Sequence, residues 1–83
     1  MKVQVRYFAS IREGLGLGAE QVDTQAATLG ALRDELLARG SAYAALLARG
    51  RAVRMALDQQ MSDESAALRE GSEVAFFPPV TGG

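Results

Sequence analysis

Nine basic and ten acidic residues in a chain of 83 give a formal net charge of −1, and this length suits one domain rather than two. Cysteine and histidine are both absent, so the sequence offers no disulfide, no zinc–thiolate site, no thiol nucleophile and no imidazole base. These absences argue against a self-contained hydrolase or transferase and against a metal site, and they favour a protein that needs a partner.

The first predicted element is a strand over residues 2–8. Val3, Val5 and Tyr7 alternate with polar side chains, as in a strand with one buried face, and Phe8 falls on the polar side. This pattern is unlike a signal peptide, and no apolar run approaches the ~20 residues of a membrane span. Because the basic residues are spread along the chain, we expect a soluble, cytoplasmic protein that binds neither membrane nor nucleic acid.

The glycine-rich stretch REGLGLG predicts a hairpin turn after the first strand. Gly14, Gly16 and Gly18 can adopt positive φ, and AEQVDT then resembles a second strand. A dinucleotide-binding loop would need a glycine where Ala19 stands, followed by a helix. We therefore expect a turn there and not a phosphate site.

Two helices are predicted in the middle of the chain. Thr28 is a suitable N-cap, and four leucines between residues 29 and 37 form one apolar stripe. Arg33 and its charged neighbours are predicted to lie mostly off that stripe, and Gly40 to end the helix. The segment SAYAALLARG predicts a second, short helix capped by Ser41.

Two further strands complete the prediction. AVRMALD alternates, QQMSDES is interpreted as turn-rich, and EVAFF is the last strand, with Val74 and Phe76 on its buried face. Pro78 and Pro79 end that strand because proline cannot donate to a sheet ladder. The order of elements indicates an α+β fold, in which a mixed sheet packs on one main helix plus a short second helix.

Phe8 and Phe77 each fall on the polar side of their own strand. An outward aromatic ring lowers solubility unless a partner covers it. If the first and last strands are neighbours, the two rings can lie together on the face away from the helix. We hypothesise that this face docks a second protein.

The printed sequence ends in FFPPVTGG. Pro78 and Pro79 favour a stiff polyproline II approach that has little entropy to lose on binding. Gly82 and Gly83 leave the terminal carboxylate carbon unshielded, so an enzyme can thread it through a narrow channel and activate it, for example as a mixed anhydride with AMP. We interpret residues 78–83, called the tail below, as a projecting rod with a reactive tip.

FAxxRE after the first strand, which comprises Phe8, Ala9, Arg12 and Glu13, and EVAFFPPVTGG at the end resemble the small subunits of molybdopterin synthase. That family consists of ubiquitin-like sulfur carriers. The resemblance implies a β-grasp fold in which residues 1–83 form a single domain. It also implies that the chain is no enzyme on its own and binds no cofactor.

What the resemblance implies for the chemistry centres on Gly83. A ubiquitin-activating-like adenylyltransferase consumes ATP to adenylate its carboxylate, and a sulfur donor protein converts it to a thiocarboxylate. The thiocarboxylate supplies sulfur for the dithiolene of molybdopterin, made from cyclic pyranopterin monophosphate in a pocket of the large subunit. The complex implied is a heterotetramer of two small and two large subunits.

The resemblance also implies partner contacts. Phe8, Met61 and Phe77 match apolar contact positions, and Arg12 matches a basic position near the tail. Asp58 stands where asparagine is common in the family. The resemblance further implies that four residues ahead of Gly82 and Gly83 contact the partner in its channel: Pro78, Pro79, Val80 and Thr81.

Other functions remain open on the sequence. The carrier could serve another pathway, such as thiamine-thiazole or tungsten cofactor synthesis. A ubiquitin-like modifier would instead join Gly83 to lysines of other proteins. A pure binding module would have a tail that is never activated.

Overall fold

The computed structural model describes residues 1–79, which form a five-stranded sheet and three helices. None of the helices in this range is long and apolar enough to cross a membrane. In chain order the elements are β1 (Lys2–Tyr7), α1 (Ala9–Leu15), β2 (Ala19–Asp23), α2 (Leu29–Leu37), α3 (Ser41–Leu47), β3 (Arg54–Leu57), β4 (Gln60–Ser62) and β5 (Glu73–Phe77).

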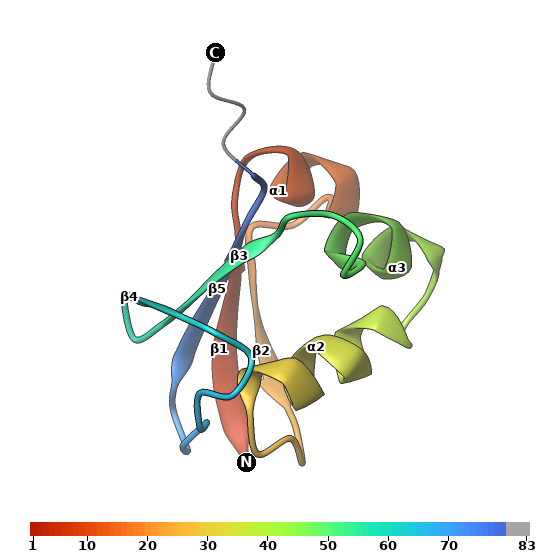
Figure 1. Ribbon diagram of the computed structural model, residues 1–83. Helices are drawn as coiled ribbons and strands as arrows, with labels where there is room; N and C mark the ends of the chain where they lie inside the picture. The colour runs from red at the N-terminus through yellow and green to blue at the C-terminus, as the bar shows by residue number, and fades with distance from the viewer. Residues whose placement is uncertain (80–83) are drawn as a thin grey trace.

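The sheet is mixed, and its strand order is β2-β1-β5-β3-β4. Only β1 and β5 run parallel, whereas the other neighbours pair antiparallel. The helices α2 and α3 lie on one side of the sheet, and the end of β5 leads into the tail beside α1 (Figure 1). This arrangement confirms the predicted α+β class.

The core lies between the sheet and the helices, as the alternation predicted. Val3, Val5 and Tyr7 of β1 are at most 1% exposed, and Val74 and Phe76 of β5 are fully buried. The α2 stripe supplies the other wall through Leu29, Leu32 and Leu36, which are also fully buried. The predicted faces of these elements are therefore confirmed.

The glycine-rich connection differs from the predicted hairpin turn, because it contains α1. Phe8 enters this helix in an extended conformation, and Gly16 ends it with φ 78°, its N–H donating to the Arg12 carbonyl. Only Ile11 of this seven-residue helix is buried. The helix therefore has too few buried apolar residues to show a helical period in the sequence. The antiparallel pairing of the two flanking strands, with Lys2 opposite Asp23, holds as predicted.

Three boundaries in the middle of the chain also differ. Thr28 caps α2 as predicted, its Oγ1 accepting from the Ala31 N–H at 3.2 Å, but the helix ends at Leu37 with Ala38 as its C-cap, before the predicted end at Gly40. Gly40 instead precedes α3, which lacks a side-chain cap from Ser41. The stretch predicted as a turn contains β4, whose three residues pair with β3.

Arg33 is 4% exposed, although the pattern predicted it off the buried stripe. Its Nε donates to the Leu47 carbonyl at 2.7 Å and its Nη2 to the Ala48 carbonyl at 3.0 Å, while Nη1 lies 3.3 Å from Glu64. Burial lowers the pKa of the Arg33 guanidinium. Because the last carbonyls of a helix lack internal partners, this arginine holds the end of α3 against α2.

Candidate partner-binding site

The parallel pairing of β1 and β5 brings Phe8 and Phe77 together. The Phe8 N–H donates to the Phe76 carbonyl at 3.2 Å, and the rings of Phe8 and Phe77 stack with centroids 4.7 Å apart and planes 10° apart. Tyr7 and Phe76 stack on the helix side instead, with centroids 6.0 Å apart. Phe8 and Phe77 therefore occupy the opposite surface of the sheet, which we call the outer face.

A strained residue sets the position of Phe8. Ala9 has φ 51°, a left-handed conformation that is costly for a residue with a Cβ. This conformation turns the chain directly from β1 into α1. Strain of this kind persists where surrounding contacts over-determine it, and here those contacts include the backbone bond and the stacked ring of Phe8.

Small side chains occupy the middle of the outer face, and the sequence pattern did not identify them as part of the site. Ala75 of β5 lies opposite Ala56 of β3, which in turn lies opposite Met61 of β4. Both alanines are 5–7% exposed, whereas Met61 is 60% exposed. The structure thus places Met61 at one end of an apolar strip and the stacked Phe8–Phe77 pair at the other.

Arginines border this strip near the tail. Arg54 lies opposite Phe77, and Arg6 lies opposite Ala75 with its Nε 3.8 Å from Glu73. An open groove of about 380 Å³ contains Arg6, Phe8, Arg12 and Gly18. The structure therefore places Arg12 in the same groove as Phe8, and its role as a partner contact stays a prediction.

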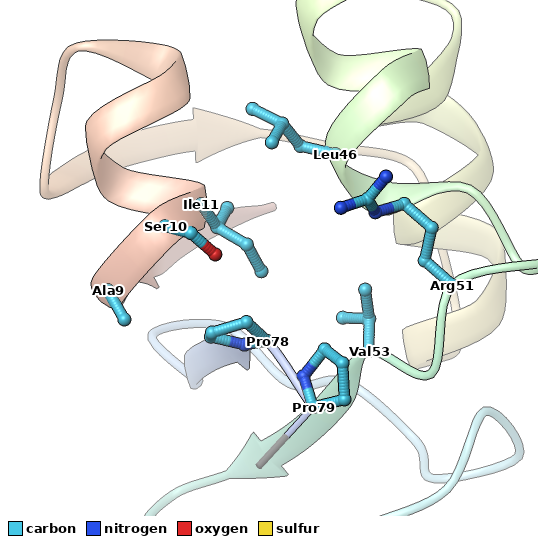
Figure 2. Close-up of a pocket in the computed structure, with 8 residues that line it drawn as sticks. All are labelled: Ala9, Ser10, Ile11, Leu46, Arg51, Val53, Pro78 and Pro79. Carbon is cyan, nitrogen blue, oxygen red and sulfur yellow. The ribbon is translucent and has the colours of Figure 1, made fainter. Parts of the chain in front are cut away.

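A second hollow lies on the helix side of the tail's first residues. Its volume is about 310 Å³, and Pro78 and Pro79 form one wall while α1 and the end of α3 form the others (Figure 2). Pro78 is half-buried and Pro79 is exposed. The apolar lining carries the guanidinium of Arg51 at its rim; the lining residues are Ala9, Ser10, Ile11, Leu46, Arg51, Val53, Pro78 and Pro79.

The predicted reactive tip, Gly82 and Gly83, lies outside the described residues, as do Val80 and Thr81 before it. Residues 1–79 contain no group of three or more histidine, cysteine, aspartate or glutamate side chains that could hold a metal ion. Asp58 accepts from the Glu73 N–H, and Asp63 accepts from Ser65. These carboxylates act as turn residues.

Comparison with known proteins gives the same family across the chain. The sequence pattern of the ThiS family matches residues 5–83. The molybdopterin synthase sulfur carrier subunits of Haemophilus influenzae and Escherichia coli are each 38% identical over 81 residues, covering 98% of this chain and 99% of theirs.

Solved structures share the fold over the full length. SAMP1 from Haloferax volcanii is 27% identical with a TM-score of 0.80, and all of both chains is covered. A protein–protein complex of subunits 1 and 2 of the molybdopterin-converting factor from Helicobacter pylori contains a chain that is 27% identical, with a TM-score of 0.71 and full coverage of both chains. These matches confirm the predicted β-grasp fold.

Proposed function

This chain belongs to the ThiS family, and from that membership we infer that it is the sulfur carrier subunit of a molybdopterin synthase. The observation that carries the inference is the 38% identity to molybdopterin synthase sulfur carrier subunits over 98% of the chain; the family match through residues 5–83 includes both the outer face and the glycine pair. The stacked Phe8–Phe77 pair supports it, because a carrier must dock on its partners before its tail can be used.

The chemistry we propose acts on Gly83. Its carboxylate oxygen attacks the α-phosphorus of ATP, held by an activating enzyme, and pyrophosphate leaves. Hydrosulfide supplied by a donor protein then attacks the acyl carbon, AMP and a proton leave, and a thiocarboxylate remains. When the thiocarboxylate gives its sulfur to cyclic pyranopterin monophosphate, water restores the carboxylate.

This chain's own contribution is to carry and present that group. With no cysteine or histidine in the sequence, it supplies neither a side-chain thiol nor an imidazole base, so the activating enzyme and the large subunit provide the catalytic groups. Pro78 and Pro79 stiffen the approach to Gly82 and Gly83, which lowers the entropy lost on entering a channel. Val80 and Thr81 would span that channel. No bound cofactor is needed, since the activating enzyme consumes the ATP.

The partner we propose is the large subunit of the synthase, in a complex of two small and two large subunits in the cytoplasm. The related Helicobacter pylori chain was solved as a complex of the two subunits. On this chain the partner surface would be the outer face, where Met61 and the stacked pair lie, together with Arg12 beside Phe8.

Intact-mass spectrometry tests the proposal directly. After incubation with ATP, the activating enzyme and the sulfur donor, we expect the mass to show one oxygen exchanged for sulfur, and only when all three are present. A chain lacking Gly83 is the control and should not change. An unchanged mass for the full chain, together with intact synthase activity without Gly83, would contradict the proposal.

A second candidate is a ubiquitin-like modifier, because the chain resembles small archaeal modifier protein 1 over its full length. Lysine-linked conjugates that end in Gly83, detected in cells by mass spectrometry, would favour it. Restoration of a strain that lacks the molybdenum cofactor distinguishes the proposed pathway from thiamine-thiazole or tungsten cofactor synthesis.

A further inference from the structure

The arginines of the described chain fall into two groups that differ in their partners. Arg33, Arg39 and Arg49 are paired, with nitrogen–oxygen distances of 2.5–3.3 Å to acidic side chains, and they hold the helices in place. Within residues 1–79, the side chains of Arg12, Arg51, Arg54 and Arg69 make no hydrogen bond or ion pair, and Arg6 has only the 3.8 Å contact with Glu73.

Apart from Arg69, the second group lies near the end of β5, where the tail begins. Arg54 is opposite Phe77, Arg51 shares a hollow with Pro78 and Pro79, and Arg6 shares a groove with Phe8. All of these arginines are exposed, Arg6 by 55% of its side chain. We call Arg6, Arg51 and Arg54 the arginine collar; Arg12, which we propose as a partner contact, shares the groove of Arg6.

Several acidic residues lie at the other end of the sheet, while Asp63 and Glu64 share a hollow with Arg54, where Asp63 accepts from Ser65 and Glu64 pairs with Arg33 and Arg49. Asp23 pairs with the first residue of β1, and Glu73 opens β5, where its N–H binds Asp58. Near the tail Glu13 is the only carboxylate of α1, and it forms no ion pair with the described residues. Although the chain has a net charge of −1, it therefore exposes three arginines near the start of the tail that have no close acidic partner among the described residues.

We propose that the large subunit presents aspartate and glutamate side chains around the opening that receives the tail, and that the arginine collar pairs with them. A carboxylate rim fits better than one phosphate group. Arg6 and Arg54 border the outer face, whereas Arg51 lies on the helix side, so no single small anion reaches all three. This proposal rests on the proposed function. It adds charged contacts to the docking surface that the proposed function requires.

The physical effect of such a rim is mainly orientation and association rate. Charges at the edge of an interface steer the encounter and reject partners of the wrong sign, and each contributes modestly to affinity. Because the collar arginines lie on both sides of the sheet near the end of β5, pairing there would align the tail with its channel before insertion.

Charge reversal tests the collar. We expect R6E, R51E and R54E each to weaken binding to the large subunit from the same organism by about three- to tenfold, and the triple variant by on the order of 100-fold, mostly through slower association. R69E is the matched control, because Arg69 is also exposed and unpaired in the described chain but precedes β5, at the far end of the sheet. Wild-type affinity should fall as salt rises from about 50 to about 500 mM, and the triple variant should lose most of that dependence.

Carbodiimide cross-linking identifies the partner chemistry. R51K and R54K keep the positive charge and add an amine to a chain whose only lysine is Lys2. We expect isopeptide bonds between the introduced amines and aspartate or glutamate side chains of the large subunit, and none with R69K. Peptide mapping by mass spectrometry locates the bonds.

The outcomes separate this proposal from the proposed function. If wild type binds the large subunit but the collar variants bind as R69E does, the collar proposal is wrong while the carrier function stands. If collar variants bind more weakly yet no isopeptide bond forms, carboxylates are not the partners and the proposal also fails. If wild type neither gains sulfur nor binds, the proposed function itself has failed.

Discussion

At the turn between β3 and β4, Asp58 and Gln59 both have positive φ, at 50° and 69°. Leu57 pairs with Gln60 across this two-residue loop, so it is a hairpin that needs the left-handed conformation at both central positions. Asparagine followed by glycine is preferred in such turns, and the sequence places aspartate and glutamine there. The strain at position 59 therefore comes from the Cβ of glutamine, because a glycine could adopt the same backbone conformation without it.

The first prediction follows from that strain. Gln59→Gly should raise the free energy of unfolding by about 0.5–1 kcal/mol, because glycine adopts positive φ without a Cβ clash. The melting temperature should rise by about 2–6 °C. Gln60→Gly, in the adjacent strand, is the control and should lower stability. A melting temperature that stays level or falls in the first variant would contradict the argument.

At the scale of elements, a network around Glu20 of β2 holds α3 against the sheet. Its carboxylate accepts from Tyr7 at 2.8 Å, Tyr43 at 3.0 Å and Arg39 at 2.7 Å. Burial by itself raises the pKa of Glu20, but the hydrogen bonds from Arg39, Tyr7 and Tyr43 outweigh it and the net pKa is lowered. A carboxyl whose pKa is lower in the folded chain stabilises it above the ordinary glutamate pKa.

Glu20→Gln should therefore lower the free energy of unfolding by about 1 kcal/mol at pH 7. The difference from wild type should narrow once the pH falls below about 4, as the folded carboxyl is protonated. Denaturant titrations between pH 7 and pH 3 measure it. Glu13→Gln is the control, since Glu13 makes no ion pair in the described chain. A difference that is constant or wider in acid would refute the role of Glu20.

At the scale of the whole molecule, the two faces of the sheet have separate tasks. Val3, Val5, Tyr7, Val74 and Phe76 face the helices and are at most 1% exposed, so they maintain the fold. The outer face carries the stacked Phe8–Phe77 pair over the buried alanines, and no described element covers it. An apolar surface of this kind, bordered by arginines, is typical of a partner interface.

Phe8→Ala and Phe77→Ala should each weaken binding to the large subunit by about tenfold or more, as expected for aromatic hot spots. Stability should fall only slightly, because both rings are half-buried. Phe76→Leu, on the core face, should show the opposite pattern, with a lower melting temperature and unchanged affinity of the folded protein. Calorimetric binding and thermal unfolding on the same samples separate the two effects; unchanged affinity for Phe77→Ala would remove the outer face as a docking surface.

The sequence by itself determined the buried faces of β1 and β5, the apolar stripe of α2 and the tail as the candidate functional segment. Alternation in β1 and β5 and the leucine spacing in α2 depend on local geometry, so period alone predicts them. The absence of cysteine and histidine pointed to the tail because side-chain chemistry was unavailable. Phe8 and Phe77 stood out because each breaks its strand's pattern.

Only the tertiary structure decided α1, β4, the burial of Arg33 and the collar. A seven-residue helix and a three-residue strand contain too few apolar positions to show a period. Arg33 is buried because the carbonyls it satisfies belong to α3, fourteen residues along the chain. Arg6 is far from Arg51 and Arg54 in sequence, and the three lie near the end of β5 because β1 and β3 both pair with that strand. Features made by distant segments depend on the pairing of strands, and no local pattern encodes that pairing.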